Sequence, residues 1–174
     1  APGTLIRGEA DLEERNRVRG IAHDSDVAKV TIRRVPDQPG IAANIFEPLA
    51  EAGISVDTIV QNSSEGNLTD LTFTLSRKDL RKAEALMPEI CEKVGAPEFT
   101  SDANLGKVSI VGVGIQTAHG YAARMFRALF DAGINIELIS TSEIRLTCII
   151  SADRVQDAVR ALHTAFELET PVAS

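Results

Sequence analysis

The chain contains one sequence pattern twice, and this repeat restricts its possible folds more than any other feature. Pro39-Gly40 corresponds to His119-Gly120, and Ala52-Gly53-Ile54 corresponds to Ala132-Gly133-Ile134, in both cases 80 positions later. A fixed separation held over such a stretch indicates two copies of one supersecondary unit. We therefore expect two domains of the same fold.

The copies differ in length only where loops are expected. Lys29-Val30 matches Lys107-Val108 at a separation of 78, and Leu71-Thr72 matches Leu146-Thr147 at a separation of 75. Insertions and deletions of this kind are tolerated in surface connections. With 174 residues, of which 44% are hydrophobic, the chain is long enough to build two small cores.

The first copy predicts the element order βαββαβ. Val30 and Ile32 alternate with polar residues, as in a strand with one buried face, whereas the apolar residues of 41–50 recur at helical spacing. Pro88 inside the second predicted helix should remove a backbone bond or bend it. The predicted elements are a strand around 30–32, a helix over 41–50, strands over 56–60 and 71–75, a helix over 80–94 and a strand over 98–102.

The second copy repeats this order, but its C-terminal stretch 167–174 is a poor strand. The apolar fragment 18–22 has no other evident place, so we expect it to pair into the second copy and close its sheet. The first module would then be inserted within the second. The predicted elements are a strand over 108–113, a helix over 121–132, strands over 136–140 and 144–150, and a helix over 154–166.

The fold class that follows is α+β, with two ferredoxin-like βαββαβ modules. In this arrangement two helices cover one face of a four-stranded antiparallel sheet. The predicted organisation is a linker over 1–17, a first domain over 26–104, a second domain made of 18–25 plus 105–168, and a tail over 169–174.

Composition and motifs exclude several functions. A net charge of -7 and 4% aromatic residues disfavour nucleic acid as a partner, including recognition by an RNA-binding ferredoxin-like domain. No apolar run approaches the ~20 residues of a membrane span, so we expect a cytoplasmic protein without a membrane partner. Cys91 and Cys148 lack metal-ligand spacing and are expected to be buried thiols. His23, His119 and His163 are scattered, so neither a catalytic residue nor a metal site is predicted.

A turn-rich loop follows the first strand of each copy, at 37–41 and at 114–120. Glycine allows a ligand to approach the backbone, and the free N–H groups at a helix start favour a carboxylate. This chemistry suits a small zwitterion. The alternative, a plain turn that feeds a helix, remains open.

Two strings carry a resemblance to a known family. Gln61-Asn62-Ser63-Ser64 followed by 69–74, and the stretch 134–145, resemble the regulatory region of aspartate kinases. The resemblance covers roughly 18–168. Pro2-Gly3-Thr4 resembles the last piece of the family's catalytic domain, which favours a segment of a longer protein over a natural small subunit.

The resemblance implies two ACT domains, a homodimer formed through them, and feedback inhibition of L-aspartate phosphorylation by L-threonine, L-lysine or both. It also implies that this region alone makes up the beta subunit of two-subunit enzymes. ATP and Mg would then bind only in the catalytic domain or alpha subunit, so this chain should hold no cofactor and should be inactive alone. The alternative is an ACT module of a different amino-acid biosynthetic enzyme, such as a dehydrogenase or an acetolactate synthase.

The resemblance finally implies two effector sites. The threonine-type site would use Asp37, Gly40, Ile41, Ala42 and Gln61, completed by Asn135 and Ile136 of the other copy on a partner chain. The second, lysine-type site would use Asp57, Ser64, Ala118, His119, Gly120, Tyr121, Ala122, Ser142 and Glu143. Lysine-responsive relatives typically show His-Pro-Gly where this chain has Ala118-His119-Gly120, so the choice of effector stays open.

Overall fold

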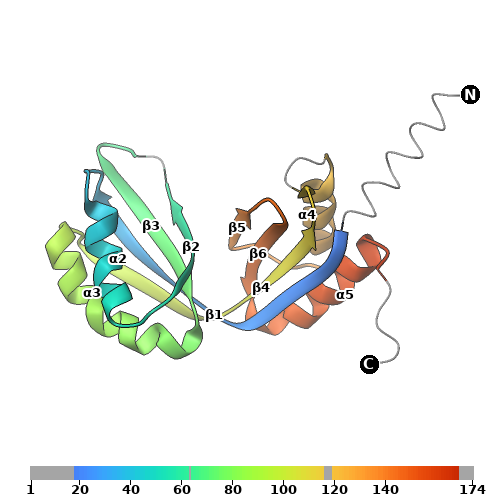
Figure 1. Cartoon of the computed structure of the whole chain (residues 1–174), viewed down its shortest axis with the longest axis horizontal. Helices are drawn as coiled ribbons and strands as arrows, with labels where there is room; N and C mark the ends of the chain where they lie inside the picture. The colour runs from blue at the N-terminus through green and yellow to red at the C-terminus, as the bar shows by residue number, and fades with distance from the viewer. Residues whose placement is uncertain (1–17, 63, 116–118, 169–174) are drawn as a thin grey trace, which may run out of the picture. The chain divides into compact units, whose positions relative to one another are not determined.

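The computed structural model describes residues 18–62, 64–115 and 119–168 (Figure 1). This part of the chain forms two compact units. We call residues 26–105 the inserted unit, and residues 18–25 together with 106–168 the flanking unit. Each unit has four-stranded pairing and two long helices, which confirms the predicted pair of ferredoxin-like modules.

Two long strands take part in both units. β1 (Val18–Pro36) and β4 (Glu98–Gly112) are neighbours in the strand order β2-β3-β1-β4-β6-β5. In the inserted unit β1 is central and β4 is an edge strand, whereas in the flanking unit β4 is central and β1 is the edge strand. The N-terminal strand therefore completes the second module, as predicted.

The sequence analysis was wrong to divide β4 into strands at 98–102 and 108–113. Gly106 lies inside this strand, not in a turn. An ideal Cβ at Gly106 would stand 2.3 Å from Val155 Cγ2 and 3.0 Å from the carbonyl oxygen of Asp24. Glycine is needed here because neighbouring atoms approach the backbone closely.

The inserted unit is built on the antiparallel pairing of β3 with β1 and β2. Alternate residues of β1 and β3 face the two helices, and Phe73 at the centre of β3 packs edge-on against Phe46 with ring centroids 5.5 Å apart. The helix α3 continues through Pro88, so this proline does not end it. The elements are α2 (Ile41–Glu51), β2 (Val56–Gln61), β3 (Leu68–Leu75), η1 (Arg77–Asp79) and α3 (Leu80–Val94).

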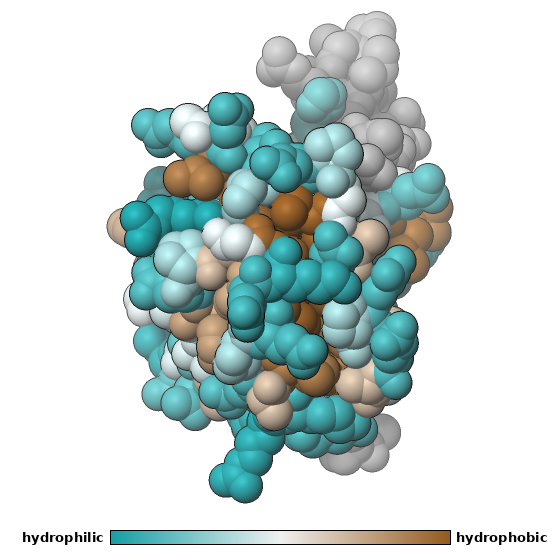
Figure 2. All heavy atoms as spheres, turned by 90° about the vertical axis from the view of Figure 1, so that its left-hand side faces the viewer, coloured by the Kyte–Doolittle hydropathy of each residue, from teal (hydrophilic) through white to brown (hydrophobic). Residues whose placement is uncertain are grey.

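The face of the inserted unit that Figure 2 shows is mostly hydrophilic. Figure 1 shows α2 and α3 side by side on one face of its sheet. Figure 2 views the molecule from that side, where hydrophilic side chains predominate and apolar ones show between them. The helices thus turn their apolar stripes inward, as the 3.6-residue periodicity predicts.

The ends of β1 and β4 that enter the inserted unit are fixed by one arginine and one aspartate. Arg77 donates through Nε to the carbonyl of Ala103 at 2.5 Å and through Nη2 to that of Leu105 at 3.2 Å. The Asp26 carboxylate accepts from the Arg77 N–H at 3.0 Å and from the Ser76 hydroxyl at 2.8 Å. Side chains of the β3–α3 connection thereby hold both shared strands.

The flanking unit repeats the plan. Its β5 pairs with β6 in antiparallel register, with Leu138 opposite Ile149. The predicted strand over 136–140 starts later than expected, at Leu138, and Ile136 before it packs against the core. The elements are α4 (Tyr121–Asp131), β5 (Leu138–Thr141), β6 (Arg145–Ser151), η3 (Ala152–Arg154) and α5 (Val155–Ala165).

A cation binds the last carbonyls of the first helix in each unit. In the inserted unit, Lys82 Nζ donates to the carbonyl of Ala52 at 3.1 Å. In the flanking unit, the Arg154 guanidinium donates to the carbonyls of Ala132 at 2.8 Å and Gly133 at 3.1 Å. These carbonyls lack an intrahelical donor and carry the negative end of the helix dipole. The cations therefore tie each pair of helices together.

We predict that Arg154→Ala lowers the free energy of unfolding by about 1 to 2 kcal/mol, because two charge-assisted hydrogen bonds are lost. Arg160→Ala is the matched control, since Arg160 is more exposed and pairs with Asp157 on its own helix. Urea denaturation measures both. Equal stability of the two variants would contradict the capping role.

We predict that Gly106→Ala lowers the free energy of unfolding by about 1 to 3 kcal/mol through overpacking. The control is Gly20→Ala in β1, where an added Cβ would meet no described atom within 4 Å. Adding Val155→Ala should recover part of the loss by removing the clashing methyl group. An unchanged urea midpoint in Gly106→Ala would contradict the close approach.

Candidate functional site

The loop before the first helix ends in the same backbone conformation in both units. Gly40 has φ 88° and ψ -8°, and Gly120 has φ 88° and ψ -13°. These values lie in the left-handed region, which side chains with a Cβ rarely adopt. An added Cβ at Gly40 would meet no described atom within 4 Å, so the backbone angle, not space, requires glycine there.

The helices that follow these glycines begin without a side-chain acceptor among the described residues. In the described part of the chain, no side chain caps α2 or α4, and neither helix has an acidic residue in its first turn. The N–H groups of a first turn have no intrahelical partner and form the positive end of the helix dipole. A carboxylate from a ligand could fill this position.

In the inserted unit, the loop is attached to the β2–β3 hairpin. The Asp37 N–H donates to the carbonyl of Asn67 at 2.8 Å, and Pro36 pairs with Leu68. The side chain of Asp37 is exposed, as are Gly40 and Ala42, whereas Ile41 is half-buried against the core. The loop is thus held through its backbone while its carboxylate remains open to a ligand.

Gln61 reaches the same end of the inserted unit from β2. It is exposed and lies opposite Leu71, while the end of β1 lies opposite Leu68 on the other side of β3. Strands that flank a common neighbour are roughly 10 Å apart. The structure therefore brings the predicted residues Asp37, Gly40, Ile41, Ala42 and Gln61 to one end of this unit.

In the flanking unit, the β5–β6 turn is attached to the end of β4. The Ser142 N–H donates to the carbonyl of Arg145 at 2.8 Å, and the Gly112 N–H donates to that of Ile144 at 2.8 Å. Ser142 and Glu143 are exposed in this turn. The second loop follows β4 directly. The start of this loop and the β5–β6 turn therefore both lie at the C-terminal end of β4.

The remaining members of the second site differ in accessibility. His119, Gly120 and Ala122 are exposed at the start of α4. Tyr121, by contrast, is only 3% exposed, and its ring packs against Phe166 with centroids 6.2 Å apart. Its side chain therefore belongs to the core. Ala118 lies outside the described residues.

Each predicted site also includes residues of the other unit. Asn135 is exposed in the flanking unit, and the neighbouring Ile136 is half-buried against that unit's core. Asp57 on β2 and Ser64 in the hairpin turn are exposed in the inserted unit. Each of these residues is exposed or partly exposed within its own unit.

Two residues of this region were missed by the sequence analysis. Arg34 adopts φ 50°, and its N–H donates to Asp70 Oδ1 at 2.9 Å. The adjacent cations Arg33 and Arg34 interrupt the strand alternation, which was the available signal for a β-bulge. Their partner Asp70, 36 residues away, could not be identified without the strand register.

Neither a nucleophilic cysteine nor a metal site is indicated by the described residues. Burial raises the pKa of the Cys148 thiol to about 12 and also raises that of Cys91. Both are buried, which confirms the sequence-based expectation and makes them poor nucleophiles. Within 18–62, 64–115 and 119–168, no cluster of His, Cys, Asp or Glu is suited to a metal, and no helix is long and apolar enough to span a membrane.

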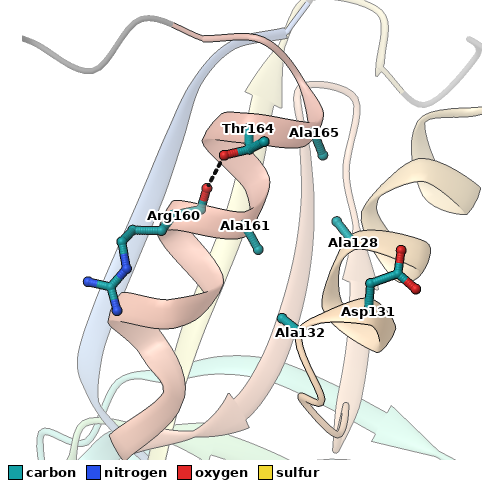
Figure 3. Close-up of a pocket in the computed structure, with 7 residues that line it drawn as sticks. All are labelled: Ala128, Asp131, Ala132, Arg160, Ala161, Thr164 and Ala165. Carbon is teal, nitrogen blue, oxygen red and sulfur yellow. Dashed lines mark hydrogen bonds between the residues drawn. The ribbon is translucent and has the colours of Figure 1, made fainter.

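The flanking unit also has a groove between α4 and α5 (Figure 3). Its floor consists of alanine side chains, and the Arg160 side chain points away from α4. The Thr164 hydroxyl donates to the Arg160 carbonyl at 3.1 Å. Convergent polar groups fix the orientation of a small polar ligand, and this groove does not present them among its described residues. The lining residues are Ala128, Asp131, Ala132, Arg160, Ala161, Thr164 and Ala165.

Comparison with known proteins matches both repeats to one domain type. ACT-domain models match residues 30–92 and 108–166. The chain is 48% identical over 171 residues to an aspartate kinase of Pseudomonas fluorescens, and 42% identical over 171 residues to an aspartokinase of Corynebacterium glutamicum. These alignments cover 98% and 96% of this chain but only 41% of each relative. The chain thus spans about two-fifths of these curated relatives.

A solved structure matches over nearly its whole length. The ligand-free regulatory subunit of aspartate kinase from Thermus thermophilus superposes with a TM-score of 0.80 at 42% identity, over 86% of this chain and 99% of that one. A chain from a crystal structure of aspartokinase alpha and beta subunits gives a TM-score of 0.80 at 41% identity, over 87% and 99%.

Proposed function

We propose that this chain, which belongs to the aspartate kinase family as its regulatory ACT-domain region, binds a free amino acid and thereby inhibits the kinase. The observation that carries this proposal is the match to 99% of a regulatory subunit of the same family. The reaction under control is the ATP-dependent phosphorylation of the L-aspartate side-chain carboxylate. Its ATP, Mg and aspartate sites belong to the catalytic domain or alpha subunit.

The chemistry at the end of the inserted unit suits an amino-acid ligand. The uncapped start of α2 offers N–H groups to the ligand carboxylate, and the exposed Asp37 carboxylate can accept from its ammonium group. The Gln61 amide both donates and accepts, so it can pair with a side-chain hydroxyl. L-Threonine provides all three groups, and we propose it as the ligand of this site.

A second site in the flanking unit would accept L-lysine or another effector. Its helix α4 also begins at a left-handed glycine without a cap among the described residues. Glu143 in the β5–β6 turn and Asp57 on β2 carry exposed carboxylates that could pair with a ligand ammonium group. The chain would then respond to threonine, lysine or both.

We propose further that two copies of the chain dimerise through their ACT domains. β2 and β5 end the strand order and expose Ile59 and Ile139, at equivalent positions of the two repeats, to 53% and 46%. Open strand edges with exposed apolar side chains favour pairing with another chain. In the dimer, the partner subunit's Asn135 and the partner subunit's Ile136 would complete the threonine site.

Inhibition follows from linkage. An effector shifts an enzyme only by the difference between its affinities for the inhibited and active arrangements, typically ~1 to 3 kcal/mol of coupling. A ligand held between two chains has such a difference, because a change of arrangement separates the halves of its site. The alternative, regulation of a different biosynthetic enzyme, has no support in the relatives described above.

We predict that calorimetric titration of the chain with L-threonine shows saturable binding. Gln61→Ala should raise Kd by roughly 10- to 100-fold, because a hydrogen bond to a polar ligand group is lost. Gln156→Ala, an exposed glutamine on α5, is the matched control and should bind normally. L-Lysine is titrated separately. Failure of a folded chain to bind either amino acid would contradict the proposed sensor.

We predict that light scattering of the chain gives the mass of a dimer, and that Ile59→Lys or Ile139→Lys shifts it towards the monomer. A lysine ammonium at a buried strand edge must lose its hydration. Val113→Lys is the control, since Val113 is 73% exposed and lies outside β2 and β5. A dimer unaffected by both edge substitutions would place the interface elsewhere.

A further inference from the structure

The last part of β1, just before the first loop, contains a strained bulge. The register with β3 shifts between Ile32 and Val35, so the strand carries an extra residue there. Arg34 occupies the bulge with φ 50°, a left-handed conformation that is unfavourable for a residue with a Cβ. Such conformations persist only where the surroundings enforce them, and they concentrate at functional sites.

The Asp70 carboxylate is the group that enforces this conformation. Its Oδ1 accepts the Arg34 N–H at 2.9 Å, and its Oδ2 lies 3.7 Å from Arg33 Nη1. The carboxylate thus satisfies the backbone donor that the bulge displaces from the strand ladder. A hydrogen bond from a backbone N–H to an ionised carboxylate is stronger than one between neutral groups, whereas the Arg33 guanidinium forms only a loose, partly exposed ion pair with Asp70.

The backbone of Asp70 binds the end of β2, which carries Gln61 of the candidate site. Its carbonyl accepts the Asn62 N–H at 3.1 Å, directly after Gln61. The buried Thr69 hydroxyl donates to the Asn62 carbonyl at 2.7 Å and so fixes the same residue from its other side. One residue of β3 therefore touches both the strand that leads into the Asp37 loop and the strand end that carries Gln61.

The second repeat lacks this arrangement. Arg145 stands at the position equivalent to Asp70, and Gly112 stands at the position equivalent to Arg34. There the Gly112 N–H donates to the backbone carbonyl of Ile144 at 2.8 Å, without a carboxylate. A fold of this type consequently does not need the aspartate, which points to a role specific to the inserted unit.

We propose that Asp70 is a positioning residue of the amino-acid site in the inserted unit. It holds the Asp37 loop and Gln61 at the separation that a bound amino acid requires. Without the carboxylate, Arg34 would relax to negative φ and carry the following loop away from Gln61. This inference rests on the proposed function of the site, whereas the restraint on the backbone can be tested without a ligand.

The test compares Asp70→Ala, Asp70→Asn and the double variant Asp70→Ala/Arg34→Gly. L-Threonine titration should show a Kd at least tenfold higher for Asp70→Ala. Asp70→Asn, which keeps an oxygen for the Arg34 N–H, should give a smaller increase. The double variant should return to within about threefold of the wild-type Kd, because glycine adopts φ 50° without strain. Asp131→Ala on α4 is the matched control and should bind normally.

Amide hydrogen exchange provides the readout that does not need a ligand. Exchange at Asp37 and Asn62 should accelerate in Asp70→Ala and slow again in the double variant. If the wild-type chain does not bind threonine, the proposed function fails while this exchange pattern still supports the positioning role. Unchanged exchange and Kd in Asp70→Ala, or no recovery with Arg34→Gly, would overturn it. If Asp70→Ala does not fold, Kd and amide exchange are compared between the wild type and Asp70→Asn instead.

Discussion

The pairing of β1 with β4 is the interaction on which both units depend. Each strand is central in one unit and an edge strand in the other, and the sheet of the flanking unit is completed by residues 18–25, which precede the whole inserted unit in the chain. Gly106 keeps β4 continuous where Val155 approaches it, and Arg77 binds the carbonyls of Ala103 and Leu105 just before that point.

The two repeats begin their first helix in the same backbone conformation, but different contacts fix the strand that precedes it. Gly40 and Gly120 adopt nearly the same left-handed conformation. The strand before Gly40 is bulged and held by the Asp70 carboxylate, whereas the strand before Gly120 is joined by backbone bonding to the turn at Ile144. Such divergence within one fold is consistent with the two different effector sites proposed above, because loops can change while the scaffold that positions them is kept.

Local patterns predicted most of this fold. The repeat and its periodicities gave the order of elements, and α3 spans the predicted residues 80–94. Sequence reasoning failed where a residue serves a distant contact: Gly106 lies inside β4 where Val155 approaches the backbone, and the Arg34 N–H is bound by a carboxylate 36 positions away. The loop glycines were identifiable from their spacing alone. Tyr121 was not identifiable as a core residue, since its ring packs against Phe166, which lies 45 positions later in the sequence.

We propose that an amino acid bound by this region controls a kinase. The most direct measurement is the rate of L-aspartate phosphorylation by the full-length kinase that carries this region, followed against L-threonine concentration for the wild type and for Gln61→Ala. We expect threonine to inhibit the wild type, and half-maximal inhibition of the variant to need at least tenfold more threonine. Absence of inhibition by threonine, or equal inhibition of both proteins, would contradict a threonine sensor at this site.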